Sequence, residues 1–133
     1  MDEVAKLAID AYKESLNYLS ILERTLVRKS KFNNDLLYGM AVMCFEKQFV
    51  GLIAHHGAMA AHHMPLALYK DAHQYERALT PEMKDTARLV GKFESICSLD
   101  GFGYKTPTDE ELKQMIIGMV EINKLISIRI PLN

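Results

Sequence analysis

The longest apolar stretch of this chain is LLYGMAVMCFEKQFVGLIA, residues 36–54. Apolar residues occupy most of its positions, and Glu46 and Lys47 are its two charged residues. The pattern predicts a helix from about Asp35 to His56. Because this helix carries apolar residues on more than one of its sides, we expect it to lie at the centre of a bundle or to be covered by a second chain.

The segments on either side predict further helices. Apolar residues recur at three- and four-residue steps over residues 2–29, which predicts a long first helix. Prolines at first-turn positions predict a short helix over residues 65–77 and another from Thr80-Pro81 to about residue 98. The Thr108 to Glu111 spacing is a capping box before a last helix. No segment shows sustained period-two alternation, so we expect an all-α, up-down bundle of four main helices plus one short helix.

Length and composition set the broad class. The 133 residues fit one domain spanning 1–133, and 49% hydrophobic with 25% charged residues exclude a disordered chain. A net charge of −1 excludes a strongly basic domain that holds nucleic acid by bulk electrostatics. The apolar central helix, together with Ile126, Ile128 and Ile130 near the end, predicts an uncovered apolar surface and hence a homodimer.

The cysteines and the first residues indicate the compartment. Cys44 and Cys97 lie in apolar helical patterns, which predicts free buried thiols in a reducing environment. The first residues lack the basic and apolar regions of a signal peptide. Glu46, Lys47 and Gln48 interrupt the longest apolar stretch, which argues against a membrane span. We therefore expect a cytoplasmic protein that is not associated with a membrane.

The five histidines gather between residues 55 and 73: His55, His56, His62, His63 and His73. Neighbouring histidines on a helix point about 100° apart, so they cannot share one ion from the same helix. None of the metal-binding patterns with histidine four residues apart is present. We expect neither a metal nor a cofactor. The competing interpretation of these histidines is an acid–base cluster.

Two further features have both a binding and a structural interpretation. The glycine-flanked loop with Phe102, Tyr104 and Lys105 could stack on a base and meet a phosphate, or it could pack back onto the bundle. Glu46 and Lys47 could line the wall of a cleft, or they could form an ion pair or a solvent-facing strip.

The sequence around these features resembles the HEPN domain (higher eukaryotes and prokaryotes nucleotide-binding). The matching residues are Ala41-x-x-x-Phe45-Glu46-Lys47-Gln-Phe-x-Gly-Leu-Ile-Ala54, then Gly57, His62-His63, Leu66-x-Leu68 and the loop from Asp100 to Tyr104. The resemblance covers roughly residues 5–127 and identifies the chain as a divergent member. It implies a helical bundle that often dimerises, and a nucleotidyltransferase partner in a toxin–antitoxin or stress system.

Active members of that family are metal-independent ribonucleases with a closely spaced arginine–histidine motif. None of the arginines here, at 24, 28, 77, 88 and 129, is followed by histidine at that spacing. The leading hypothesis is therefore a non-catalytic HEPN-like domain that binds a nucleotide, a nucleic acid or a partner protein. Its candidate ligand-binding residues are Glu46, Lys47, His62, His63, Phe102, Tyr104 and Lys105. The alternatives are a ribonuclease with an atypical site, such as His63 with Lys105 or Tyr104, and a pure interaction scaffold.

Overall fold

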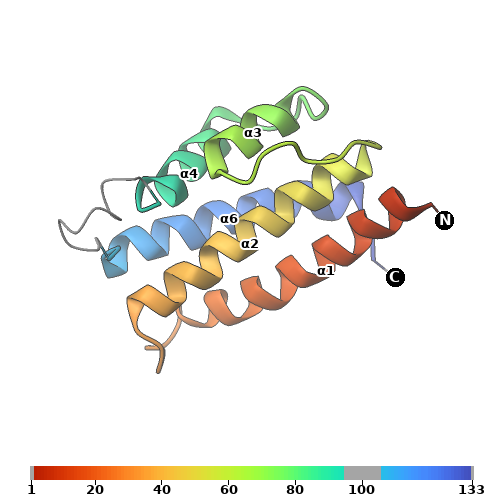
Figure 1. Cartoon of the computed structure of the whole chain (residues 1–133). Coiled ribbons are helices and arrows are strands. Elements are labelled where there is room, and N and C mark those ends of the chain that lie inside the picture. The colour runs from red at the N-terminus through yellow and green to blue at the C-terminus, as the bar shows by residue number, and fades with distance from the viewer. Residues whose placement is uncertain (1, 95–105, 133) are drawn as a thin grey trace.

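A computed structural model of the chain describes residues 2–94 and 106–132. These residues form five α-helices: α1 (Glu3–Arg24), α2 (Asn34–His55), α3 (Pro65–His73), α4 (Pro81–Lys92) and α6 (Asp109–Arg129). Within the described ranges there is no strand, which confirms the all-α prediction. The four longer helices alternate in direction along the chain, as expected for an up-down bundle (Figure 1).

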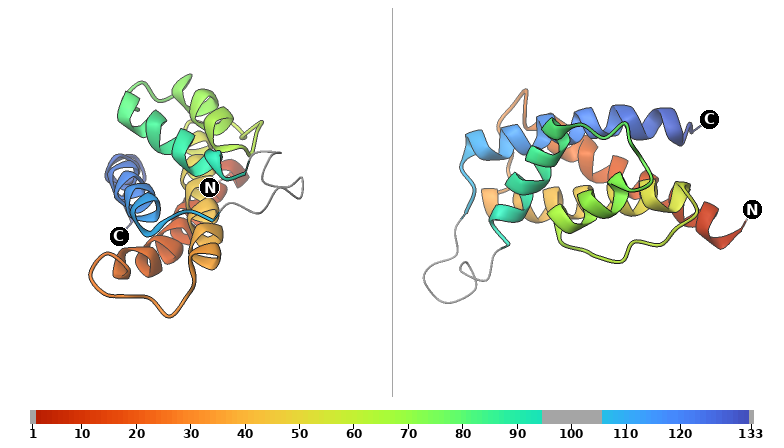
Figure 2. Two further views of the ribbon diagram at one scale, coloured as in Figure 1. Left: turned by 90° about the vertical axis from the view of Figure 1, so that its left-hand side faces the viewer. Right: turned by 90° about the horizontal axis from the view of Figure 1, so that it is seen from above.

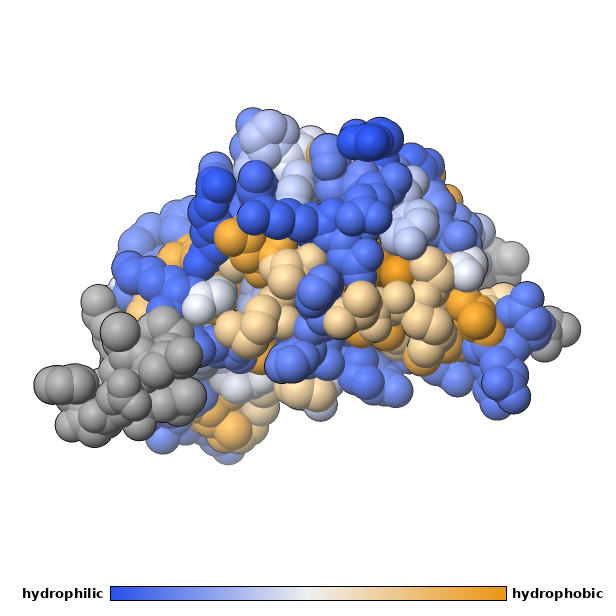
Figure 3. Space-filling view, turned by 45° about the horizontal axis from the view of Figure 1, so that its top comes forward, coloured by the Kyte–Doolittle hydropathy of each residue, from blue (hydrophilic) through white to orange (hydrophobic). Residues whose placement is uncertain are grey.

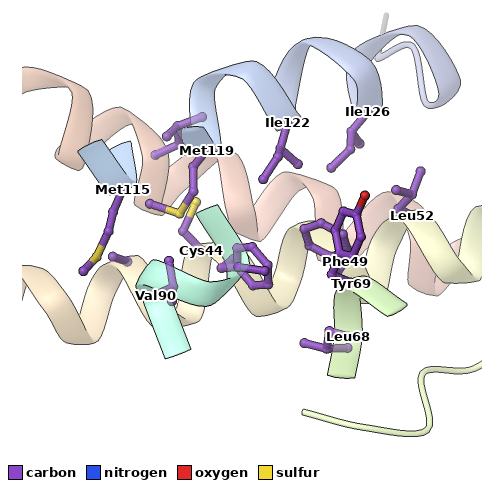
Figure 4. Close-up of a cluster of buried hydrophobic side chains, with 14 of the residues drawn as sticks. Cys44, Phe49, Leu52, Leu68, Tyr69, Val90, Met115, Met119, Ile122 and Ile126 are labelled. Atoms are coloured by element: carbon purple, nitrogen blue, oxygen red, sulfur yellow. The ribbon is translucent and has the colours of Figure 1, made fainter. Parts of the chain in front are cut away.

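The helix α2 lies at the centre of the bundle, as its sequence predicts. It contacts α1, α3, α4 and α6, and the views along and across the bundle show these helices arranged around it (Figure 2). Phe45, Phe49, Leu52 and Ile53 are fully buried on it. Figure 4 shows Ile122 and Ile126 of α6 facing Phe49 and Tyr69, and Met115 and Met119 near Cys44 and Val90. One contiguous core thus draws side chains from all five helices.

Small residues bring α1 and α2 into close contact. A Cβ atom on Gly51 of α2 would lie 3.2 Å from the carbonyl oxygen of Ala8 and 3.3 Å from the amide nitrogen of Tyr12. Both neighbours are backbone atoms of α1, which cannot rotate away as a side chain can. Glycine at this position therefore sets the short distance between the two helices.

The apolar character of α2 also bears on membrane association. By length and composition α2 could cross a membrane, and 56% of its most apolar 18-residue window is buried inside the bundle. Core helices of soluble proteins meet the same criteria. Length and composition alone therefore do not make α2 a membrane span.

Three sequence-predicted helices end earlier than expected. The first stops at Arg24 instead of residue 29, because the residues beyond it bury little apolar surface: Leu26 is 38% and Val27 85% exposed. The short helix stops at His73 instead of residue 77, so His73 and Arg77 do not share a helical face. The fourth stops at Lys92, and residues 95–105 lie outside the described part. The predicted caps by Thr80 and Thr108 are confirmed, the latter as a complete capping box.

Two connections also differ from the sequence-based expectation. The segment 57–64 does not turn directly into α3 but runs back along α2, so that α3 starts level with the middle of α2 (Figure 1). Near the other end of the chain, α6 continues to Arg129 and buries Ile126 and Ile130, leaving Ile128 70% exposed. The predicted apolar surface of three isoleucines is therefore wrong, because helical spacing turns two of them into the bundle.

Candidate functional site

The segment 57–64 brings the predicted histidines back over α2. Gly57, with φ of 84°, ends α2 in the left-handed conformation that glycine adopts without strain. The amide of Ala61 donates to Asp71 Oδ2 of α3 at 3.0 Å and fixes the middle of the segment. His62 and His63 follow, both exposed.

Glu46 and His63 belong to one electrostatic environment, together with a residue that the sequence did not single out. Burial raises the pKa of the half-buried Glu94 carboxyl, the charge of Glu46 raises it further, and His63 opposes the shift. Two carboxylates beside one imidazole make this corner of the molecule acidic. Such a corner favours a cationic or hydrogen-bonding group and disfavours a phosphate.

Lys47 does not share this environment, because it binds another helix. Its Nζ lies 3.1 Å from Glu14 Oε2 of α1, and both side chains are partly exposed. The ion-pair interpretation is correct for Lys47. Adjacent residues on a helix point in different directions, so the Glu46–Lys47 pair is divided between two faces of α2.

The remaining candidates, Phe102, Tyr104 and Lys105, lie outside the described residues, as does Cys97. The other cysteine, Cys44, is a buried free thiol as predicted. Burial, with a contribution from Glu23, raises the pKa of this thiol to about 12. Cys44 is therefore a packing residue and not a nucleophile.

The best-formed polar cluster is one that the sequence did not predict. The carboxylate of Glu76, in the α3–α4 connection, is 4% exposed. Arg129 at the end of α6 donates to both of its oxygens, from Nε at 2.7 Å and from Nη2 at 3.0 Å. His56 Nε2, just beyond α2, lies 3.1 Å from Oε1, and the amide of Ala78 donates to Oε2 at 3.2 Å. We call Glu76, Arg129 and His56 the Glu76 cluster.

The electrostatics of this cluster suit a structural clamp better than acid–base chemistry. The hydrogen bonds from Arg129 outweigh burial, and with those from His56 and Ala78 they lower the pKa of Glu76 to about 2. The pKa of the neighbouring His55 is lowered by burial and by His56 and Arg129. A carboxylate that is ionised at neutral pH and saturated with donors is neither a general acid nor a free base. The cluster fastens the ends of α2 and α6 to the α3–α4 connection.

This geometry predicts a specific acid sensitivity. The pKa of Glu76 is 4.5 in an unfolded chain and about 2 when folded, so the unfolded state takes up the proton first as the pH falls. The contribution of about 3 kcal/mol is complete above pH 4.5 and is lost as the pH falls toward 2. Urea denaturation of the wild type and of Glu76→Gln should show a stability difference that shrinks over this range. A difference that is independent of pH would contradict the assignment.

The described residues contain no group of three or more His, Cys, Asp or Glu side chains arranged to hold a metal ion. Comparison of the sequence and fold with family models, curated proteins and solved structures found no significant match. The HEPN resemblance and the ligand site built on it therefore stay predictions.

Proposed function

We propose that this protein is a non-catalytic, HEPN-like helical module that acts by binding other protein chains, beginning with a second copy of itself. The observation that carries the proposal is the solvent-facing side of α2. Leu36 is 48% and Met43 36% exposed, with Met40 and Val50 half-buried on the same side. The returning segment adds the exposed Met59 and Met64. We call these six residues the α2 face; apolar residues gather around this part of the surface in Figure 3.

The spacing along the α2 face is that of a helix-packing seam. Positions 36, 40, 43, 47 and 50 follow each other at alternating steps of four and three, which is the repeat of residues that pack one helix on another. A two-fold axis near Met43 would place Leu36 against Val50 of the second copy. Lys47, drawn aside by Glu14, interrupts the seam without closing it.

Electrostatics support a protein partner over a phosphate-bearing ligand. Glu46 and Glu94 lie close enough for one to raise the pKa of the other, and they stand where the predicted nucleotide wall was expected. A phosphate beside this pair would be repelled. A nucleotidyltransferase, which the HEPN resemblance implies as a partner, fits the proposal as a second protein chain in the cytoplasm.

The absence of catalysis is supported by the Glu76 cluster. In this cluster an arginine and a histidine both contact one carboxylate, that of Glu76. There the arginine donates to both oxygens of the buried carboxylate, and this bidentate pairing occupies one edge of its guanidinium. The arrangement stabilises the fold and does not present a base and a cation to RNA.

Met43→Lys should convert a dimer into a monomer, because a lysine in the middle of an apolar seam has no partner and must lose its hydration. We expect dimer affinity to fall by more than about ten-fold, measured by sedimentation. Val27→Lys is the matched control, because Val27 is 85% exposed and lies away from the α2 face. The proposal fails if Met43→Lys, with an unchanged circular dichroism spectrum, keeps the mass of the wild type.

A further inference from the structure

A groove lined by residues of α4 and α6 lies on a part of the surface that shares no residue with the α2 face. Its volume is about 580 Å³. The two helices run antiparallel: Lys92 Nζ binds Glu111 Oε2 at 3.2 Å near one end, and Thr86 meets Gly118 in the middle. The view from above in Figure 2 shows α4 crossing α6 at an angle.

The floor of the groove is apolar and in part exposed to solvent. It is formed by Met83 and Leu89 of α4 and by Ile117 of α6, which is 41% exposed. The close contact at Gly118 keeps the two helices near each other and leaves their outer ridges as walls. The lining residues span about two turns of each helix, a length over which a bound helix can contact both.

The charged residues that line the groove are acidic: Glu82, Asp85 and Glu121. Two of them have basic neighbours on their own helix, Arg88 with Asp85 at 3.4 Å and Lys124 with Glu121 at 3.1 Å. These pairs are exposed and one turn apart, so they hold the acidic groups weakly. Glu82 has no ion pair in the described part of the chain.

We propose that this groove binds an amphipathic, basic helix of a partner protein. Apolar side chains one turn apart on that helix would lie on Met83, Leu89 and Ile117. Lysine or arginine residues flanking them would face the acidic walls, which fix the position of the helix and speed its association. Because the groove and the α2 face share no residue, this partner would bind whether or not the protein dimerises.

The test uses the full chain and a synthetic helix of about four turns, made of leucine at helical spacing and lysine elsewhere. Its binding is measured by calorimetry at physiological salt. Glu121→Lys and Ile117→Asn should each weaken binding by about ten-fold. Glu23→Lys is the matched control: it makes the same charge change at an exposed position of α1 and should leave the affinity unchanged.

The results distinguish a basic helix of another protein from a second copy of this chain and from diffuse charge attraction. Equal loss of affinity in Glu23→Lys and Glu121→Lys would show diffuse charge attraction and overturn the proposal. A lower mass for Glu121→Lys than for the wild type, without the peptide, would replace the foreign helix by a second copy of this chain. Unchanged peptide binding by the Met43→Lys variant would support the groove whether or not the α2 face forms a dimer.

Discussion

Replacing Arg129 with alanine is expected to lower the free energy of unfolding by about 3 kcal/mol. The substitution leaves the Glu76 carboxylate, which is 4% exposed, without the two hydrogen bonds that lower its pKa most. A buried charge that loses its partner keeps its full desolvation cost. Chemical denaturation at pH 7 measures the effect. The acid sensitivity assigned to Glu76 should largely disappear in the same variant.

Removing the other partner, by Glu76→Ala, should cost a similar amount at pH 7, about 3 kcal/mol, because it removes the ionised carboxylate and with it both hydrogen bonds from Arg129. Arg88→Ala is the matched control, because it removes an arginine from the exposed pair with Asp85 and should cost less than about 1 kcal/mol. Equal losses for Arg129→Ala and Arg88→Ala would show that the Glu76 cluster is not a clamp.

Gly118→Ala is expected to destabilise the fold by about 1–2 kcal/mol, although alanine is the better helix former. A Cβ atom there would overlap Thr86 Oγ1 and lie 2.7 Å from Cγ2 and 2.9 Å from Cβ of the same residue. The overlap must push α4 and α6 apart, at a cost of up to about 3 kcal/mol, and helix propensity returns about 1 kcal/mol of this. Denaturation at one fixed protein concentration gives the difference.

Two further variants test whether the overlap with Thr86 causes this loss of stability. Gly39→Ala in α2 meets nothing within 4 Å, so the same substitution there should stabilise the protein by up to about 1 kcal/mol. Thr86→Ala added to Gly118→Ala removes the two nearest atoms and should restore most of the lost stability. If Gly118→Ala and Gly39→Ala change stability with the same sign, the close contact of α4 and α6 does not limit the packing.

Much of the fold could be predicted because its signals are local. The apolar pattern of residues 36–54 places α2 in the core, and Thr80 and Thr108 mark helix starts through their own hydrogen bonds to nearby amides. The helix ends were predicted less well. Residues 25–29 continue the pattern of α1, but Leu26 and Val27 bury little of their side chains, and the extent of burial is a tertiary property.

The polar cluster could not be predicted for the same reason. Glu76 stands 53 residues from Arg129 and 20 from His56, and each of the three residues alone resembles an ordinary surface residue. Glu46 and Lys47, in contrast, are adjacent in the sequence but have different surroundings in the fold. Their proximity in the sequence suggested a shared wall, but the helix directs Lys47 to Glu14 and leaves Glu46 near Glu94.

The mass of the wild-type protein in solution tests whether the α2 face forms a dimer. Light scattering at micromolar concentration should give twice the 15.1 kDa of one chain, because in the proposed dimer a second copy covers the α2 face. The Met43→Lys variant, measured in the same run, should give the mass of one chain. A wild-type mass of one chain at this concentration would contradict the account, since the α2 face would then be an exposed surface without a partner.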